Sequence, residues 1–189
     1  SYAPFKPGQR IDEIVSFVDL APTILSLAGM DKPAQMQGRA FLGPKRMESE
    51  KDAAVFLYAD RFDEIYGMRR GITDGHWKYI RCFTPHLPAA PYSFYQFGQS
   101  GWSAWQKAWQ EGKLDACHNR IWETPQAVES LFDTLNDPWE TQNLAEDPAY
   151  AERLAAMRER LKRTMIEMVD TGLVPEPMFA DLSPEKPIA

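Results

Sequence analysis

The chain has 189 residues, of which 44% are hydrophobic and 12% aromatic, which is enough for one domain with a sizeable core. This composition excludes a disordered or collagen-like polymer. The formal net charge of -6 is spread along the sequence without a basic patch, which argues against nonspecific nucleic-acid binding. No apolar run is long enough to span a bilayer, and the first residues lack the pattern of a signal peptide. We therefore expect no nucleic-acid partner and no membrane partner.

The first expected element is a short helix over residues 20–28. Asp19 can cap its N-terminus, Pro22 falls in the first turn, where backbone donors are unpaired in any case, and Gly29 can end it. The residues expected on its apolar face are Leu20, Ile24 and Leu27.

Three segments rich in aromatic and β-branched residues predict strands after a charged stretch at 43–52 that has no periodicity. They are residues 53–58, 66–72 and 77–83, and Asp74-Gly75 is typical of a hairpin turn between the last two. A fourth strand is expected at 130–135. The sequence therefore predicts an antiparallel sheet of about four strands.

A dense aromatic segment follows the third predicted strand. Trp102, Trp105 and Trp109 are spaced by three and four residues, which fits one face of a short helix. Because aromatic side chains bury large areas, a compact cover over the sheet is favoured over a sugar-stacking platform. The remaining members of the segment are Tyr92, Phe94, Tyr95 and Phe97.

The segment ESLFDTLNDPWETQNLA at 129–145 joins the fourth strand to a long helix. Asn136-Asp137-Pro138 supplies side-chain acceptors and a fixed φ for a turn. Asp147 can cap the helix, with Pro148 in its first turn. Apolar residues at spacings of three and four predict this helix over 148–170, and its apolar stripe should cover one side of the sheet. The stripe consists of Leu154, Met157, Leu161, Met165 and Met168.

Residues 129–148 resemble the closing signature of type I sulfatases. Two earlier segments strengthen this resemblance: VSFVDLAPTILSLAG at 15–29 is similar to the family's VSxVDLAPTxLxLAG element, and QGRAFL at 37–42 to its QGxSL loop. From Lys6 to Glu176 the chain resembles the C-terminal region of N-sulfoglucosamine sulfohydrolase-like sulfatases. This resemblance implies the C-terminal subdomain of an alkaline phosphatase-like α/β fold, in which a long C-terminal helix packs on a small antiparallel sheet.

The resemblance also implies a division of the chain. We expect residues 1–50 to be the end of an N-terminal α/β domain, residues 51–172 to be the C-terminal sulfatase subdomain, and residues 173–189 to be a Pro-rich tail. The helix at 20–28 would normally lie on the large parallel sheet of the N-terminal domain. Its apolar face is therefore expected to favour self-association where that sheet is absent.

Four charged residues lie in the segment YADRFDEIY at 58–66, between the first two predicted strands. Because charge is costly to bury, we expect this segment to be a loop at a sheet edge. It resembles the DRxDExY segment near the substrate pocket of sulfatases that act on carbohydrates. An arginine can hold a sulfate with two parallel hydrogen bonds, and carboxylates can accept from sugar hydroxyls. The substrate-binding candidates in this segment are Asp60, Arg61, Asp63 and Glu64.

For two candidate residues, Arg61 and His86, an alternative to substrate binding stays open. Arg61 could instead form an ion pair with Asp63 or Glu64 that braces a turn. His86, in the segment TPHLP at 84–88, resembles the family's MPHxP loop and could contact an anionic group of a substrate. A histidine in a loop could equally be a surface or packing residue.

The chemistry of the family requires groups that this segment lacks. Type I sulfatases use a formylglycine made from Cys or Ser in a C/S-x-P/A-x-R motif and a calcium ion held by Asp and Asn. Cys82 and Cys117 are outside such a motif, and we expect both to be buried free thiols. No catalytic or metal-binding residue is therefore expected here, and the resemblance implies that formylglycine and calcium belong to the intact enzyme. A sulfate ester is not readily cleaved without an activated nucleophile and a Lewis acid, so the segment alone is predicted to be inactive.

The resemblance implies that the intact protein hydrolyses sulfate esters or sulfamates of a carbohydrate, with a sulfated small molecule or glycan as its partner. An extracytoplasmic location, periplasmic or lysosomal, is typical of the family. One alternative is a phosphonate or phosphate monoester hydrolase of the same superfamily. Another is a binding or assembly module without catalytic activity.

Overall fold

The computed structural model describes residues 8–48, 52–174 and 178. The chain forms two compact units, one within residues 1–55 and 73–77 and the other within residues 56–72 and 78–189. The expected division at residues 50 and 172 stays a prediction, and most of the expected Pro-rich tail lies outside the described residues. None of the helices in the described ranges is long and apolar enough to cross a membrane.

The first unit contains the 3-10 helix η1 (Phe17–Asp19) and the helix α1 (Leu20–Leu27). The predicted helix is thus present, but Asp19 does not cap α1 through its side chain. Its carboxylate instead accepts hydrogen bonds from the backbone N–H groups of Ser16 and Arg39, each at 2.9 Å. Asp19 therefore joins η1 to the following loop, which is why it is unavailable to α1.

The polar side of α1 is buried and its apolar side is exposed. Thr23 Oγ1 accepts from Phe41 N at 3.1 Å and Ser26 Oγ accepts from Lys45 N at 3.0 Å, which fixes the loop against the helix. Gly43 has a φ of 90°, and a Cβ there would lie 2.5 Å from Ser26 Oγ, so only glycine fits this close approach. The exposed apolar residues are Phe17, Leu20, Ile24 and Leu27.

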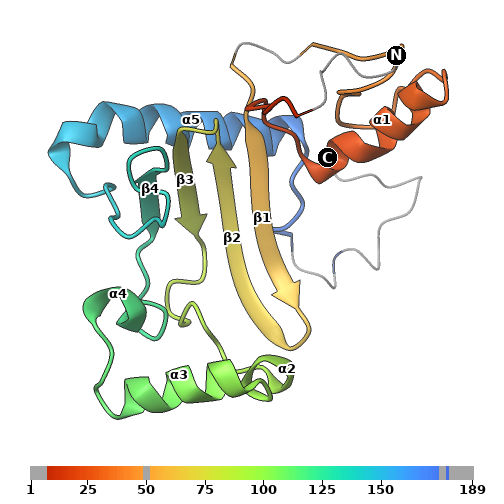
Figure 1. Cartoon of the computed structure of the whole chain (residues 1–189). Coiled ribbons are helices and arrows are strands. Elements are labelled where there is room, and N and C mark those ends of the chain that lie inside the picture. Colours follow the sequence, from red (N-terminus) through yellow and green to blue (C-terminus); the bar gives the residue numbers. More distant parts are fainter. Residues whose placement is uncertain (1–7, 49–51, 175–177, 179–189) are drawn as a thin grey trace. The chain divides into compact units, whose positions relative to one another are not determined.

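The second unit contains most of a four-stranded antiparallel sheet in the order β1-β2-β3-β4, whose turn between β2 and β3 belongs to the first unit (Figure 1). The strands are β1 (Val55–Phe62), β2 (Ile65–Thr73), β3 (Trp77–Cys82) and β4 (Glu129–Asp133). At the turn after β2, Asp74 Oδ1 accepts from the N–H groups of His76 and Trp77, as the Asp-Gly signal predicts.

The loop expected at 58–66 is mostly strand. β1 continues to Phe62 and β2 begins at Ile65, so the turn consists of Asp63 and Glu64 alone. The expectation was wrong because a strand at the edge of a sheet can present charged side chains to solvent or to a buried partner without a loop.

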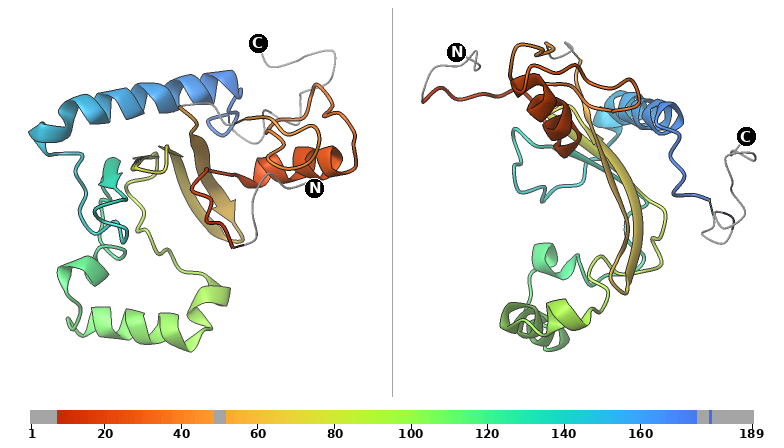
Figure 2. Two further views of the ribbon diagram at one scale, coloured as in Figure 1. Left: turned by 45° about the horizontal axis from the view of Figure 1, so that its top comes forward. Right: turned by 90° about the vertical axis from the view of Figure 1, so that its right-hand side faces the viewer.

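The long helix is confirmed and covers one face of the sheet (Figure 2). It consists of the 3-10 turn η2 (Pro148–Tyr150) and α5 (Ala151–Glu167). Asp147 Oδ1 accepts from Ala149 N at 2.9 Å, so the predicted cap is present. The buried residues of its apolar stripe are Leu154, Met157 and Leu161.

A polar cluster joins α5 to the sheet. Tyr79 donates from its hydroxyl to Glu129 Oε1 at 2.5 Å, and Arg158 of α5 binds both oxygens of the same carboxylate at 2.7 and 2.9 Å. Burial and the hydrogen bond to Glu129 raise the pKa of Tyr79 to about 12. The bidentate pair of Arg158 with Glu129, a carboxylate that also accepts from the buried Tyr79, thus joins α5 to β3 and β4.

The signature after β4 is held by one amide side chain. Asn143 Oδ1 accepts from Leu131 N at 2.9 Å and from Ala145 N at 3.1 Å, and its Nδ2 donates to Glu129 O at 3.0 Å. Leu144 N also donates to Leu131 O at 2.9 Å. Asn143 therefore provides hydrogen-bond partners for backbone groups at the edge of β4, and the signature segment ends the sheet at this strand.

The helices of the aromatic segment lie beyond the turn between β1 and β2 (Figure 1), and the aromatic rings of the segment contact one another. It contains α2 (Phe94–Phe97), α3 (Ser100–Gln110) and α4 (Ala116–Asn119). The ring of Trp122 is buried, and it stacks on Trp109 at 5.3 Å and meets Trp105 edge to face at 6.1 Å. Cys82 is buried as expected, whereas Cys117 is exposed, because it lies on the short helix α4, where its neighbours Ala116 and His118 are exposed too.

Replacing Asn143 with Ala is expected to lower the free energy of unfolding by about 2–3 kcal/mol, because the partly buried Leu131 N–H and Glu129 C=O lose their partner. Urea unfolding measures this change. Asn136→Ala in the same segment is the matched control, because the hydrogen bonds of Asn136 are exposed. Equal losses in the two variants would contradict the role of Asn143.

The folded state holds the Tyr79 proton more tightly than the unfolded chain, whose tyrosine pKa is near the ordinary 10.0. The contribution of Tyr79 to stability is therefore fully present below about pH 10 and is lost as pH rises through 12. Ultraviolet titration of phenolate formation should show a late ionisation near pH 12, and Tyr79→Phe should remove that step. A late step that survives in Tyr79→Phe would refute the assignment.

Candidate functional site

Arg70 is a buried cation in the middle of the sheet, with a side chain that is 1% exposed. Its guanidinium binds two carboxylates side by side. Asp60 accepts from Nη1 at 2.8 Å and from Nη2 at 3.2 Å, and Asp170 accepts from Nε at 2.6 Å and from Nη2 at 3.1 Å. Nη1 also donates to the backbone oxygens of Ala59 and Arg69. All three nitrogens of the guanidinium are thus bound within the protein.

This network connects β1, β2 and the segment that follows α5. The hydrogen bond from Arg70 holds the pKa of Asp170 below its ordinary value. The chain is packed closely here, since a Cβ on Gly172 would lie 1.7 Å from Arg70 Nη2. Asp60, which the sequence predicts to face substrate, therefore has its carboxylate directed to Arg70.

The turn between β1 and β2 holds two more of the predicted residues. Asp63 is exposed and has a φ of 50°, the left-handed conformation that this two-residue turn requires. Glu64 Oε1 accepts from Phe94 N at 2.6 Å. Hydrogen bonds from the N–H groups of Glu64 itself and of Phe94 hold the pKa of Glu64 below its ordinary value. Glu64 therefore fastens the start of α2 to the hairpin.

Arg61 and His86 lie at the surface. The Arg61 guanidinium lies over the Tyr66 ring, 5.5 Å from its centroid, across the same hairpin. His86 is exposed in the loop after β3, and its neighbours in that loop, Pro88 and Ala89, line a pocket. The structure thus brings Asp60, Arg61 and the loop of His86 to one hairpin, and the role of each residue in substrate binding stays a prediction.

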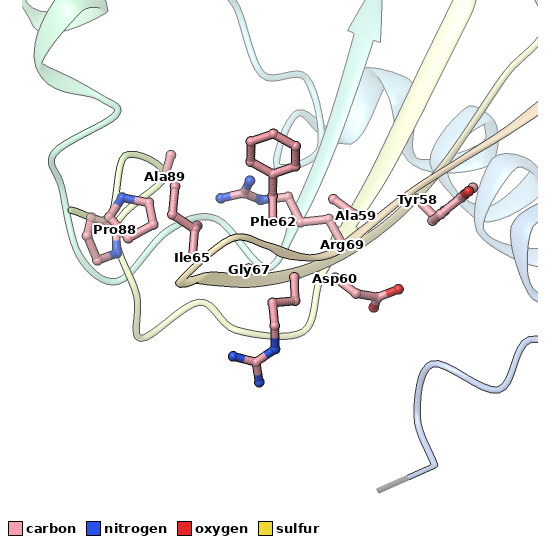
Figure 3. Close-up of a pocket in the computed structure, with 11 residues that line it drawn as sticks. Tyr58, Ala59, Asp60, Phe62, Ile65, Gly67, Arg69, Pro88 and Ala89 are labelled. Atoms are coloured by element: carbon pink, nitrogen blue, oxygen red, sulfur yellow. The ribbon is translucent and has the colours of Figure 1, made fainter. Parts of the chain in front are cut away.

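A pocket of about 320 Å³ lies along this hairpin (Figure 3). One wall comes from β1 and β2 and the other from residues 88–91. Figure 3 shows the side chains of Phe62 and Arg69 on one side of the hairpin and that of Asp60 on the other. The lining residues are Tyr58, Ala59, Asp60, Arg61, Phe62, Ile65, Gly67, Arg69, Pro88, Ala89 and Pro91.

Sequence reasoning missed Arg69 and Gln126. Arg69 Nη2 donates to Gln126 Oε1 at 2.8 Å, and Gln126 holds the pocket loop by donating from its backbone N–H to Pro85 O at 2.8 Å and from Nε2 to Leu87 O. The sequence feature that could have pointed to Arg69 is the pair of adjacent arginines in a predicted strand. Alternation places one on each face of the sheet, so Arg69 and Arg70 cannot share a role.

Comparison with known proteins agrees with this architecture. The family model described as N-sulphoglucosamine sulphohydrolase, C-terminal, matches residues 2–97. An ulvan-active sulfatase of Formosa agariphila is 32% identical over 167 residues, which cover 87% of this chain and 27% of that protein. Human N-sulphoglucosamine sulphohydrolase is 25% identical over 187 residues, which cover 88% of this chain and 35% of that protein. The chain thus spans about a third or less of the length of the curated relatives that it matches.

Two solved structures share the fold. A putative sulfatase from Bacteroides thetaiotaomicron superimposes with a TM-score of 0.51 at 21% identity, over 87% of this chain and 26% of that chain. A 2-O GAG sulfatase superimposes with a TM-score of 0.52 at 21% identity, over the same shares. The class of protein is therefore a sulfatase, of which this chain is one part. The chain belongs to the family of the C-terminal region of N-sulphoglucosamine sulphohydrolase.

The residues present do not fit the metal that the family implies. Across residues 8–48 and 52–174, no three His, Cys, Asp or Glu side chains are placed together to hold a metal ion. The carboxylates of the hairpin are directed instead to Arg70 and to Phe94 N. No residue described here is therefore assigned to calcium.

Replacing Arg70 with Ala is expected to lower the free energy of unfolding by about 3 kcal/mol, because Asp170 is left buried without its counter-charge. Arg61→Ala on the same hairpin is the matched control and should cost at most about 1 kcal/mol, the size of an exposed cation–π contact. Chemical denaturation compares the two variants. If both variants lose the same stability, the buried network does not have the role that its geometry indicates.

Proposed function

We propose that this chain is the substrate-shaping part of a sulfatase that hydrolyses sulfate esters or sulfamates of a carbohydrate. The observation that carries the proposal is the match of residues 2–97 to the C-terminal family of N-sulphoglucosamine sulphohydrolase. The names of the relatives support a sugar substrate: two are ulvan-active sulfatases, and one structure is described in complex with D-glucosamine-2-N,6-O-disulfate. Ester and sulfamate substrates are both consistent with these names.

In this proposal the chain helps to select the substrate, and the sulfate ester or sulfamate bond is cleaved in another part of the protein. The formylglycine nucleophile and the calcium ion that the family resemblance implies would come from another part of the protein. Cleavage of a sulfate ester needs both an activated nucleophile and neutralisation of the developing charge. The residues described here supply neither, so the chain by itself is proposed to be inactive.

The residues that we propose to help select the substrate lie at the hairpin and the adjoining loop. Arg61 is exposed, and a guanidinium has the geometry to hold a sulfate or carboxylate. Asp63 and His86 are also exposed, whereas Asp60 and Glu64 would act by holding the hairpin in shape through Arg70 and Phe94 N.

The full-length protein that contains this chain is expected to release inorganic sulfate from a sulfated sugar. Arg61→Ala should change the ratio of kcat/KM values between differently sulfated sugars by about 10-fold, the size of one charge-assisted hydrogen bond. Ion chromatography of released sulfate measures both effects. Arg163→Ala, an exposed arginine of α5, is the control and should leave the ratio unchanged.

One result would contradict the sulfatase assignment, and another would contradict only the role of Arg61. Hydrolysis of phosphate or phosphonate monoesters in preference to sulfate esters would identify a different hydrolase of the same superfamily. Equal kcat/KM ratios in wild type and Arg61→Ala would remove Arg61 from substrate selection while leaving the sulfatase assignment in place.

A further inference from the structure

Gly67 leaves open space in β2, two residues after the strand begins. A Cβ added there would meet no atom within 4 Å, and its φ lies outside the left-handed region, so neither packing nor backbone conformation requires glycine. Gly71 in the same strand is different, because its Cβ would lie 2.9 Å from Tyr79 O. A glycine inside a strand weakens the strand and often marks a position where a ligand approaches the backbone closely. Gly67 lines the pocket of the hairpin, so the open space belongs to that pocket.

Arg69 provides a fixed cationic group two residues further along β2. Its Nη2 is held by Gln126 Oε1 at 2.8 Å, and Gln126 is itself fastened to the backbone of the pocket loop. Among the residues that the structure describes, Nε and Nη1 of Arg69 have no hydrogen-bond partner. Nη2 carries two N–H groups and Gln126 binds one of them. Its other N–H, together with Nε or Nη1, forms one edge of the guanidinium that is preorganised to bind an oxyanion through two parallel hydrogen bonds.

The charge around Arg69 favours an anionic ligand. The lining of the pocket includes one carboxylate, Asp60, which lies on the other side of the hairpin from Arg69 (Figure 3). This carboxylate is paired with the buried Arg70. The lining also includes a second arginine, Arg61. No acidic side chain of the lining therefore competes with an external anion for Arg69.

An exposed aromatic ring lies beside the guanidinium. Phe62 is 71% exposed, and its ring and the Arg69 side chain lie on the same side of the hairpin (Figure 3). Pro88 and Ala89 close one end of the pocket. The volume of about 320 Å³ is at the small end of ligand pockets, which suits one sugar ring and its substituent.

We infer that this pocket binds a sugar ring that carries a sulfate or carboxylate group, and that this group is a different one from the sulfate that the enzyme removes. Arg69 receives the sulfate or carboxylate group, Phe62 contacts the apolar face of the ring, and Gly67 makes room for the ring against β2. Gln126 is a positioning residue, because it orients Arg69 and holds the opposite wall. The inference rests on the proposed function for the choice of a sugar ligand, but binding in this pocket needs no turnover.

The test is an NMR titration of the 189-residue chain with D-glucosamine-2-N,6-O-disulfate. D-glucosamine, the same sugar without its sulfate groups, is the control ligand. The amide signals of Gly67 and Arg69 should shift with the sulfated sugar. Arg69→Ala should raise Kd at least 10-fold, since it removes a charge-assisted pair of hydrogen bonds. Gly67→Val should also abolish binding by filling the open space, and a β-branched residue is well suited to a strand. Arg163→Ala should leave Kd unchanged.

Each other outcome overturns the inference. Undiminished binding by Gly67→Val would show that no ring lies on β2, and undiminished binding by Arg69→Ala or equal binding of D-glucosamine would show that no oxyanion is recognised. Absence of shifts in the wild-type chain would refute the pocket altogether. The failure of the proposed function is distinct, because it is the absence of sulfate release by the full-length protein, which this titration does not measure.

Discussion

The buried pairing of Arg70 with Asp60 and Asp170 is the constraint on which the arrangement of the sheet and its hairpin depends. A guanidinium that is 1% exposed is stable only if its donors are satisfied by the protein, and here two carboxylates from distant parts of the chain satisfy them. The network crosses from β1 to β2 and reaches the segment after α5. It therefore fixes both the hairpin and the end of the helix with one group, and the close approach of Gly172 is a consequence of the same packing.

The same constraint separates the hairpin into two faces with different tasks. Alternation along β2 places Arg70 on the face that carries the ion pairs and Arg69 on the opposite face, beside Phe62. Because Asp60 is occupied by Arg70, the face of Arg69 keeps a positive character. A structural ion-pair network on one side of a strand can thus engage the nearest carboxylate and keep it from pairing with an arginine on the other side.

Much of the secondary structure could be predicted from local patterns. Four strands, the Asp-Gly turn, the cap at Asp147 and the apolar stripe of α5 follow from short-range physical rules, and each is present within a few residues of its expected position. The role of Asp60 was not predictable in this way, because its partner Arg70 lies 10 residues away in sequence. The second carboxylate on Arg70, that of Asp170, lies a further 100 residues away. The same holds for Gln126, which is 57 residues from Arg69.

The amino-acid sequence by itself determined the family, the antiparallel sheet and the long helix, because periodicity, turn residues and the closing signature are properties of neighbouring residues. Only the tertiary structure decided which of the carboxylates at the hairpin bind groups within the protein and which of the charged residues there are exposed. The reason is physical: burial and pairing depend on groups brought together from distant segments. A carboxylate next to an arginine in sequence gives no indication of which arginine it binds in the folded chain.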